Sequence, residues 1–238
     1  MVYSDIQNRV SSRQSRGRDF DISIISIPGG IPKWHLAVQF LTLRKRVFVD
    51  AMQWSLFHDD DLEFEQYDNY GRTTYVIAHR GNEVIGGARL LRTDTVLGSA
   101  GGLQYSYMIR DACLGLLPNM PTALCEGEAP VSGRIWELTR LVSDSKDPSV
   151  NQAILSATNE YLWEIGASEC LFLGPPAFMK MAKRMGFTPK PLGKIQGNKD
   201  GRFLAFGCDV IQPDEIVEPA QAPLMPAALS ESLDSLAL

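Results

Sequence analysis

The sequence predicts one α/β domain in which helices flank a mixed β-sheet. Segments with helical spacing of apolar residues alternate along the chain with short β-rich runs, and this alternation is typical of a sheet covered by helices. The 238 residues are 45% hydrophobic and 21% charged, which is the composition of a globular protein with a substantial core. The sequence shows no internal repeat, in agreement with a single domain.

The first half of the chain is expected to hold a helix followed by a β-hairpin. Residues 26–32, SIPGGIP, have the composition of a turn. A helix is predicted over 34–54, because Phe40, Arg44 and the apolar residues after them recur at steps of three and four. Two β-rich runs around a short polar turn predict a hairpin over 73–91.

The second half is expected to alternate between strand and helix. The predicted elements are a strand over 135–143, a helix over 147–167, a strand over 169–174, a basic helix over 177–186 and a strand over 202–210. Ser149 and Gln152 are expected to form a capping box at the start of the first helix. Gly186 is expected to end the second helix.

The ends of the chain differ in composition from the predicted domain, which spans 21–210. Residues 1–20 are polar and arginine-rich, and a loose arm is expected there. Residues 211–238 are acidic, rich in Pro and Ala and without aromatic residues, which predicts a disordered tail.

Composition also limits the class of protein. The four cysteines form no CxxC pair, which favours reduced thiols over disulfides or a zinc site. There is no signal-peptide pattern and no long apolar run, so we expect a cytoplasmic protein without a membrane span. The net charge of −5 disfavours a nucleic-acid partner.

One segment departs from this average charge. Residues 178–202 hold seven basic side chains against Asp200 alone, a local charge of +6. The basic residues are Lys180, Lys183, Arg184, Lys190, Lys194, Lys199 and Arg202. The segment is either a docking surface for an acidic partner or a solvated amphipathic helix and loop.

An acidic stretch, HDDDLEFEQYD, follows the first predicted helix. It contains six carboxylates and no basic residue: Asp59, Asp60, Asp61, Glu63, Glu65 and Asp68. The stretch lacks the glycine that a calcium loop of the EF-hand type needs, so a metal site is not expected. The three successive aspartates fit a solvated turn. The alternation of acids and aromatics in EFEQYD fits a partly buried pocket wall instead.

Two further groups of residues carry possible chemistry. Arg44 and Phe48 share one helix face, and Trp54 follows near the helix end; all three are either core residues or part of a pocket. Glu137 and Arg140 are three residues apart and would face opposite sides of a regular strand. They can share a pocket only if the strand is bulged or twisted between them.

In this order and spacing the residues resemble the acyl-homoserine-lactone synthases of the LuxI type. The resemblance spans about residues 36–190. The matching motifs supply Arg44, Phe48 and Trp54, then Glu63, Glu65 and Asp68, then Arg89, then Glu137 and Arg140. Two positions depart from the family pattern: Glu65 stands where the family usually has Asp, and Arg92 stands where it often has Pro.

The resemblance implies a fold and a reaction. The fold would be a GNAT-like α/β sandwich with a V-shaped cleft. The substrates would be S-adenosylmethionine and an acyl thioester of acyl carrier protein or coenzyme A. The products would be an N-acyl-homoserine lactone, 5′-methylthioadenosine and the free carrier, and neither a metal nor a further cofactor is needed.

The resemblance also implies roles for the residues. Glu137 would be the base that activates the substrate amine, and Arg44 or Arg140 would hold the substrate carboxylate. Phe48 and Trp54 would face the sulfonium. The acids would either complement the cationic substrate or anchor the arginines. The basic residues Lys180, Lys183, Arg184, Lys190 and Lys194 would dock the acyl carrier, and the apolar segments 103–117 and 154–178 would line the acyl pocket.

Two other functions remain open from the sequence. An ordinary GNAT N-acetyltransferase would carry a [QR]xxGx[GA] loop at a helix start, and no such match occurs. A non-catalytic sensor that binds an acyl ligand or S-adenosylmethionine would release no methylthioadenosine.

Overall fold

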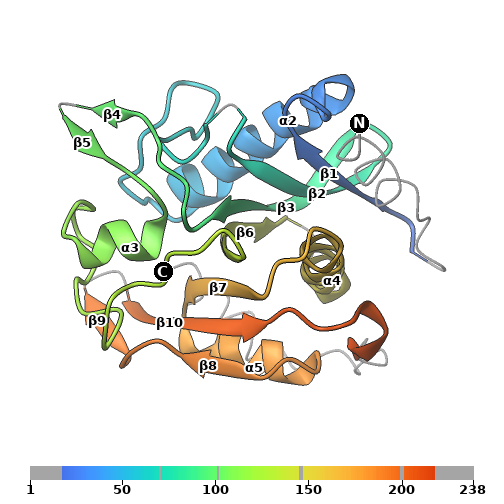
Figure 1. The fold of residues 1–238 in the computed structure, drawn as a ribbon. Helices are drawn as coiled ribbons and strands as arrows, with labels where there is room; N and C mark the ends of the chain where they lie inside the picture. The colour runs from blue at the N-terminus through green and yellow to red at the C-terminus, as the bar shows by residue number, and fades with distance from the viewer. Residues whose placement is uncertain (1–17, 70, 101, 145–146, 199–200, 218–238) are drawn as a thin grey trace.

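The computed structural model describes residues 18–69, 71–100, 102–144, 147–198 and 201–217, and Figure 1 shows their fold. The expected arm over 1–20 therefore lies outside the described residues except for its last three. Of these, Phe20 is buried in the core, so the domain begins slightly earlier than predicted.

Eight strands of the described chain form one mixed sheet in the order β1-β2-β3-β6-β7-β10-β8, and β9 pairs with the start of β10. Their bounds are Asp21–Ser26 (β1), Thr74–Arg80 (β2), Glu83–Arg92 (β3), Ile135–Ser143 (β6), Glu169–Gly174 (β7), Pro189–Pro191 (β8), Gln196–Asn198 (β9) and Gly201–Asp209 (β10). The pair β6–β7 is parallel and the other described pairs are antiparallel. A separate two-stranded sheet joins β4 (Ser99–Ala100) to β5 (Leu103–Gln104).

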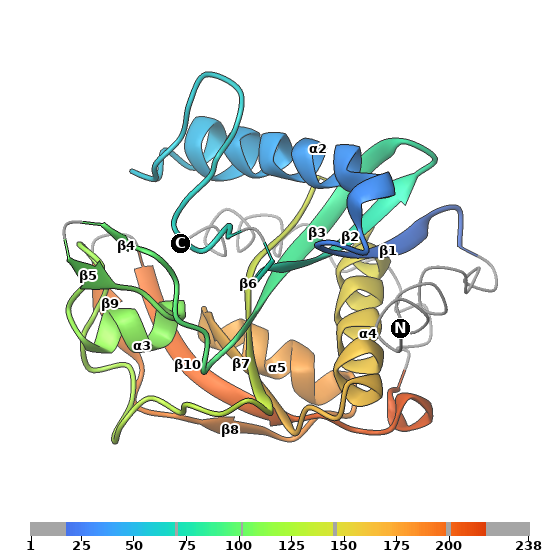
Figure 2. The ribbon, with the colours of Figure 1, turned by 45° about the horizontal axis from the view of Figure 1, so that its top comes forward.

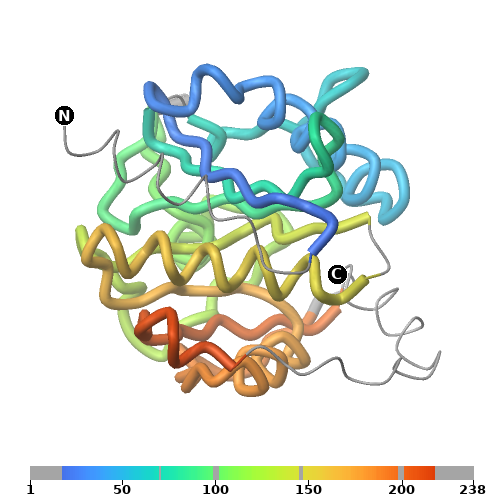
Figure 3. Tube along the Cα trace, turned by 90° about the vertical axis from the view of Figure 1, so that its right-hand side faces the viewer, coloured from blue at the N-terminus to red at the C-terminus, as the bar shows by residue number. Residues whose placement is uncertain are grey.

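Helices cover both faces of this sheet. Their bounds are Ile31–Lys33 (η1), Trp34–Arg44 (α2), Lys45–Ala51 (η2, a π-helix), Met108–Cys113 (α3), Pro148–Glu164 (α4), Pro176–Arg184 (α5) and Pro213–Glu215 (η3). Figure 2 shows α2 and α4 on opposite sides of β1, β2 and β3, and Figure 3 looks onto α4 from outside the sheet.

Alternation along the strands sorts the core between the two faces. On one face Phe40 of α2 packs with Tyr75 and Ile77 of β2. On the other face Ile154 of α4 packs with Val76. Helix α3 lies on the α2 face, over β7 and β10, whereas α5 lies on the α4 face. The α2 face therefore has two helical covers, α2 and α3, and the chemically interesting side chains lie on this face.

Two adjacent glycines let helices approach β3 closely from both sides. A Cβ on Gly86 would lie 3.1 Å from Val150 of α4. A Cβ on Gly87 would lie 2.8 Å from the ring of Phe40 in α2. Neither position has room for a larger residue without moving a helix, which explains the glycine pair in the middle of a strand.

The parallel pair β6–β7 is short. It runs from Ile135 opposite Glu169 to Leu138 opposite Phe172, whereas β6 continues to Ser143. The two central strands therefore diverge after Leu138. This divergence is the sheet feature that the V-shaped cleft of the GNAT-like fold requires.

Most predicted elements are confirmed. The strands over 135–143 and 169–174 have the predicted bounds, and the hairpin, the basic helix and the last strand agree within two residues. The helix over 34–54 exists, but its last part is the π-helix and it ends at Ala51.

Other predictions were wrong. The cap of α4 is Asp147, whose carboxylate accepts the Ser149 N–H at 2.8 Å, so the capping box of Ser149 and Gln152 does not form. Pro148, which suits the first helical position, follows this cap and begins the helix. Strand β1 and helix α3 were not expected. The first residues of the expected tail, 211–217, form η3 and pack against α4, and the rest of the tail lies outside the described residues.

Candidate active site

The residues singled out from the sequence meet on the sheet face that carries α2 and α3. They come from the end of α2 with η2, the loop over 52–73, β3 and β6. Arg44, Glu63, Arg89 and Glu137 are 0% exposed. Ionisable groups are rarely buried so completely without specific partners, and each of these has them.

Arg44, the last residue of α2, is held by two carboxylates. Its guanidinium donates to Asp68 through two nitrogens, at 2.7 and 2.9 Å, and its Nε donates to Glu63. Burial alone would raise the pKa of Asp68, but the guanidinium groups of Arg89 and Arg44 outweigh it and hold that pKa well below its usual range. Asp68 therefore remains ionised in the interior.

Arg89 of β3 extends the same network. It donates to Asp68 Oδ2 at 3.0 Å, to Glu65 Oε1 at 2.7 Å and to Thr139 Oγ1 at 3.1 Å. Its guanidinium also lies 5.3 Å from the ring centre of Tyr67. Four groups, Asp68, Glu65, Thr139 and Tyr67, thus fix one side chain.

Arg140 joins the network through a bulge in β6. Arg89 pairs with Thr139 and Gly87 with Val142, so β6 has one more residue than β3 in this interval. Arg140 has a φ of +55° in this bulge. The bulge turns Arg140 to the same face as Glu137, and the predicted break in strand alternation is therefore confirmed.

The contacts of Arg140 are longer than those of Arg44. Its Nη2 lies 2.9 Å from Glu65 Oε1 and 3.3 Å from Glu63 Oε1. Its guanidinium lies 5.7 Å from the ring centre of Phe48. Burial raises the pKa of Glu65, but Arg140 and Arg89 outweigh it and lower that pKa below its usual range. Arg140 is the member of the cluster with the least complete set of short contacts.

The cluster is electrically balanced. Three arginines face three carboxylates, Glu63, Glu65 and Asp68, and the ion pairs connect all six side chains. Of the two roles left open for the acids, the structure shows that they anchor the arginines. Glu65, where the family usually has Asp, reaches both Arg89 and Arg140 with a single oxygen.

Phe48 and Trp54 form a stacked aromatic pair beside Arg140. Their ring centres are 5.0 Å apart and their planes differ by 9°. Trp54 Nε1 is buried and has no hydrogen-bond partner among the described residues. A buried indole N–H without a partner is costly to the folded protein.

Glu137 of β6 lies at the start of α3. Its two carboxylate oxygens accept the backbone N–H groups of Met108 and Ile109, each at 2.8 Å. Burial raises the pKa of Glu137 from 4.5 to about 7, although the two amide hydrogen bonds act in the opposite direction. Near neutral pH this carboxylate can therefore both lose and take up a proton.

Three residues of the site were missed in the sequence. Tyr67 donates to Asp111 at 2.8 Å, and Asp111 also accepts the Ser106 N–H at 2.9 Å. Tyr75 donates to Asp68 at 2.9 Å. Asp111 belongs to α3, a helix too short to show periodicity, and that is why no signal pointed to it.

The remainder of the acidic stretch is exposed. Asp59, Asp60 and Asp61 face solvent, and Asp59 Oδ1 accepts the backbone N–H groups of Asp61 and Leu62. These three aspartates form the solvated turn that was one of the two interpretations of the stretch.

The five basic residues expected to dock an acyl carrier are all exposed. Lys180, Lys183 and Arg184 lie on α5. Lys190 in β8 pairs with Asp209 at 2.6 Å, and Lys194 follows β8 in the chain. The three cations of α5 form no ion pair within the described residues.

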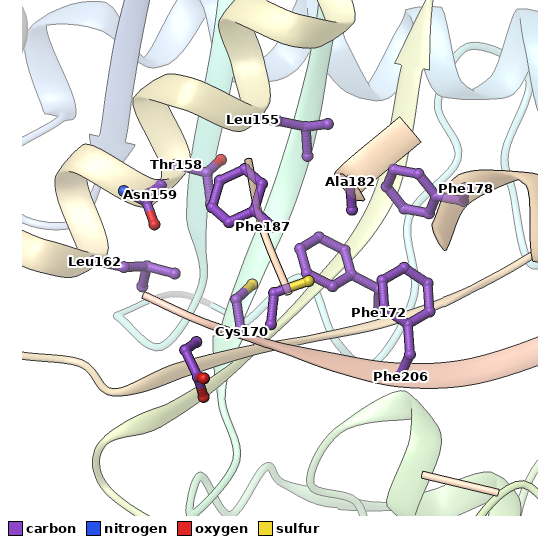
Figure 4. A pocket seen from close by; sticks show the side chains of 12 residues that line it. Leu155, Thr158, Asn159, Leu162, Cys170, Phe172, Phe178, Ala182, Phe187 and Phe206 are labelled. Carbon is purple, nitrogen blue, oxygen red and sulfur yellow. The ribbon is translucent and has the colours of Figure 1, made fainter. Parts of the chain in front are cut away.

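A cavity lies on the opposite face of the sheet, between α4, α5, β7 and β10 (Figure 4). Its volume for a water-sized molecule is about 20 Å³, about enough for one water. Its main lining residues are Leu155, Thr158, Phe172, Phe178, Phe187 and Phe206. Residues of the segment 154–178 line this cavity, whereas 103–117 packs on the other face.

Two general features complete the description. Among the residues that the structure describes, no three His, Cys, Asp or Glu side chains are grouped so that they could hold a metal ion. Within the same residues, no helix has the length and apolar character needed to cross a membrane.

The chain is similar to known proteins over most of its length. Residues 35–209 match the family model described as autoinducer synthase. The acyl-homoserine-lactone synthase of Acinetobacter baumannii is 29% identical over 174 residues, which cover 66% of this chain and 83% of that protein. The isovaleryl-homoserine lactone synthase of Bradyrhizobium diazoefficiens is 26% identical over 163 residues, 65% of this chain and 64% of that protein.

Solved structures agree in fold. The CoA-dependent acyl-homoserine lactone synthase BjaI, solved with SAM and isopentyl-CoA, has a TM-score of 0.68 at 21% identity, covering 89% of this chain and 98% of that one. The diverging mixed sheet is the GNAT-like α/β sandwich of such synthases. The family match and the relatives define an acyltransferase.

The chain belongs to the autoinducer synthase family. It is an enzyme that makes an acyl-homoserine-lactone signal for quorum sensing.

Proposed function

We propose that this enzyme joins the amine of S-adenosylmethionine to the acyl group of a thioester. Three parts of the site have separate roles in this reaction. The charged cluster with its aromatic pair holds S-adenosylmethionine. Glu137 removes the proton from its amine. The acyl tail enters between the diverging strands toward the small cavity on the opposite face, which widens to hold it. The observation that carries the proposal is Glu137, a fully buried carboxylate with a pKa of about 7 that shares a sheet face with the cluster.

The cluster suits a zwitterionic, sulfonium-bearing substrate. The guanidinium of Arg44 is fully engaged by two carboxylates, whereas the contacts of Arg140 are longer. Arg140 is therefore better placed to bind the substrate carboxylate through two N–H groups. The stacked rings of Phe48 and Trp54 lie beside Arg140 and would receive the sulfonium, a contact worth about 0.5–2 kcal/mol. The unpartnered Trp54 N–H supplies a donor there.

Acylation needs the substrate amine in its neutral form. The unperturbed pKa of an α-amino group is about 7.7–8.0, close enough to that of Glu137 for efficient proton transfer. Glu137 takes the proton directly or through one water. The amine nitrogen attacks the thioester carbonyl, the amide bond forms, and the carrier leaves as a thiol. A backbone N–H beside the diverging strands would stabilise the developing oxyanion.

Lactonisation follows without a protein nucleophile. An oxygen of the substrate carboxylate attacks the carbon attached to the sulfonium, the carbon–sulfur bond breaks, and methylthioadenosine leaves with the electron pair. The reaction is intramolecular, so the cluster contributes by holding the carboxylate and the sulfonium in register.

The divergence of β6 and β7 places the acyl group. Glu137 pairs with Leu171, one residue before the last pair of Leu138 with Phe172. Phe172 also lines the cavity. A thioester that enters where the strands separate would have its carbonyl near Glu137 and its tail among the aromatic rings behind the sheet.

The acyl donor is proposed to be a thioester of acyl carrier protein or coenzyme A. Both carriers are anionic, and the exposed cations of α5 would steer either one. BjaI, similar in fold, is CoA-dependent, which supports including coenzyme A thioesters in any assay. The four free cysteines and these substrates support a cytoplasmic location.

The test is a product assay. Purified protein is mixed with S-adenosylmethionine and a panel of acyl carrier protein and coenzyme A thioesters, and mass spectrometry follows methylthioadenosine and lactone. We expect equal amounts of both products from the wild type and a large loss in Glu137→Gln. Glu169→Gln is the matched control, because Glu169 of β7 also has a raised pKa but lies outside the site.

Each alternative has its own result. An acylated amine without methylthioadenosine would indicate an N-acetyltransferase instead. Binding of S-adenosylmethionine without any product, across a panel that a known synthase turns over, would indicate a sensor.

A further inference from the structure

Glu137 is held by a helix that is too short to be stable alone. Its two carboxylate oxygens accept the backbone N–H groups of Met108 and Ile109, the first two residues of α3, each at 2.8 Å. Helix α3 has six residues, and its N-cap, Tyr107, makes no side-chain hydrogen bond to the helix. Isolated helices shorter than about 12–15 residues are marginal in water. The place of the Glu137 carboxylate therefore depends on the contacts that fix the first turn of α3.

Asp111, in this first turn, makes such contacts. Its side chain is 0% exposed, and its Oδ2 accepts the N–H of Ser106, which lies just before the helix, at 2.9 Å. The same oxygen accepts the Tyr67 hydroxyl at 2.8 Å. Arg110 Nη1 lies 3.7 Å from the other oxygen, Oδ1. Asp111 therefore ties the start of α3 to a tyrosine of the loop over 52–73.

Tyr67 belongs to the part of this loop that supplies the charged cluster. It stands between Glu65 and Asp68 in the chain, and its ring centre lies 5.3 Å from the Arg89 guanidinium. Its side chain is 1% exposed, and Met108 of α3 packs against the small apolar group that includes it. One side chain therefore contacts both the arginine network and the helix that holds the buried carboxylate.

We propose that Tyr67 and Asp111 are positioning residues, which hold the first turn of α3, and through it the Glu137 carboxylate, at a fixed place relative to the charged cluster. The inference rests on the proposed function, because it takes Glu137 as the base. Neither positioning residue touches a substrate. The amine is anchored by the cluster and the base by α3, so a small displacement between the two lowers the rate of proton transfer.

The first variant is Tyr67→Phe, which removes the hydroxyl and keeps the ring beside Arg89. A looser α3 should lower kcat by about ten- to hundredfold and leave the KM for S-adenosylmethionine unchanged. The rate should rise with pH as the base ionises. Burial raises the pKa of Glu137, whereas the N–H groups of Ile109 and Met108 lower it. Weaker bonds from these groups should therefore move the rise to higher pH.

The second variant, Asp111→Asn, should move the rise in the opposite direction. Its amide oxygen can still accept the Ser106 N–H, and its amide nitrogen can donate to the Tyr67 oxygen. Burial is the main cause of the raised pKa of Glu137, and the negative charge of Asp111 adds to it. Removing this charge while keeping the contacts should move the rise to lower pH, with a smaller loss of kcat than in Tyr67→Phe.

The matched variant is Tyr75→Phe, measured in the same way as methylthioadenosine release across pH. Tyr75 is also a buried tyrosine that donates to an aspartate, Asp68 at 2.9 Å, but it belongs to β2 and supports the cluster without contacting α3. Its loss should appear in the KM for S-adenosylmethionine, and its rate should rise at the wild-type pH.

Two results would overturn the inference: Tyr67→Phe keeps the wild-type kcat, or its rate rises at the same pH as that of the wild type. The second result would mean that the hydroxyl supports stability only. Circular dichroism checks that each variant is folded, and the direction of the shift in Asp111→Asn decides if Tyr67→Phe does not fold. Lactone formation with a large loss in Glu137→Gln leaves the proposed function intact after these failures, whereas full activity in Glu137→Gln rejects both.

Discussion

The two faces of the central sheet differ in the kind of side chains they carry and in how these side chains pack. On the α2 face, three arginines and three carboxylates are joined by buried ion pairs, which hold their side chains in place. On the α4 face, aromatic rings surround a small apolar cavity of about 20 Å³. A buried network of ion pairs presents one fixed geometry, which suits a substrate that never varies. An apolar wall can be reshaped by single substitutions, which suits the part of the product that varies between enzymes.

The largest effect is expected from opening the charged cluster. Asp68→Asn removes the carboxylate shared by Arg44 and Arg89 and leaves two buried cations under-compensated. The free energy of unfolding should fall by about 3–5 kcal/mol in urea titrations. Asp60→Asn, a change of the same chemistry on an exposed residue of the same loop, should alter it by less than about 0.5 kcal/mol. Equal effects at the two positions would mean that the cluster is not a structural unit.

Glu137→Gln should lower kcat/KM by about 10²- to 10⁴-fold. The wild-type rate should rise with pH through about 7, where Glu137 ionises, and the variant should lack this rise. The rise is measured as a pH–rate profile of the wild type and of Glu137→Gln. Glu169→Gln is the control and should have the wild-type profile. A profile that is unchanged in Glu137→Gln would remove Glu137 from the reaction.

The raised pKa of Glu137 also predicts how the stability of the protein changes with pH. The folded-state pKa of Glu137 lies above the value of 4.5, so folding favours the protonated form. The unfolded chain releases this proton first as pH rises. The wild type should therefore lose stability relative to Glu137→Gln between pH 4.5 and about 7, measured by urea unfolding across that range.

On the other face, Phe178→Ala should act on selectivity more than on rate. Removing this ring enlarges the cavity beside Phe172 and Phe206. The kcat/KM for longer acyl thioesters should rise by about tenfold relative to the preferred wild-type donor. The KM for S-adenosylmethionine should stay constant. Phe57→Ala, a change at a 76% exposed ring, is the control and should leave both quantities unchanged.

The smallest effect is expected at the surface. Reversing two charges of α5 with Lys183→Glu and Arg184→Glu should raise the KM for a carrier-bound thioester by about three- to tenfold at low salt. The effect should shrink as salt screens it. Arg72→Glu, an equally exposed cation in the loop before β2, serves as the control. A salt-independent change would assign these cations to something other than docking.

The two faces also differ in how far the sequence predicts them. The charged face could be predicted, because its residues have unusual types at recognisable spacing, and the interval from Glu137 to Arg140 forces a bulge that the structure contains. What could not be predicted there is how the charges pair, since Arg44 and Asp68 are 24 residues apart. The partners of Glu137 are backbone N–H groups, which carry no residue signal.

The sequence predicts much less about the α4 face, which carries the aromatic cavity. Thr158 lies in an ordinary amphipathic helix, and only the packing of α4 on β7 and β10 shows that its hydroxyl is unpaired. Helix α3 was missed for a related reason, since six residues are too few for a period to show. Local pattern predicts elements, whereas cavities depend on how distant elements pack.

The most direct test of the division between the two faces is a crystal structure of the protein with S-adenosylmethionine and an unreactive acyl-thioether analogue of the preferred donor. We predict the sulfonium against Phe48 and Trp54, the substrate carboxylate on Arg140, and the acyl tail between the diverging strands, directed toward α4 and α5. An acyl tail bound on the α2 face, or S-adenosylmethionine bound away from the charged cluster, would contradict the account.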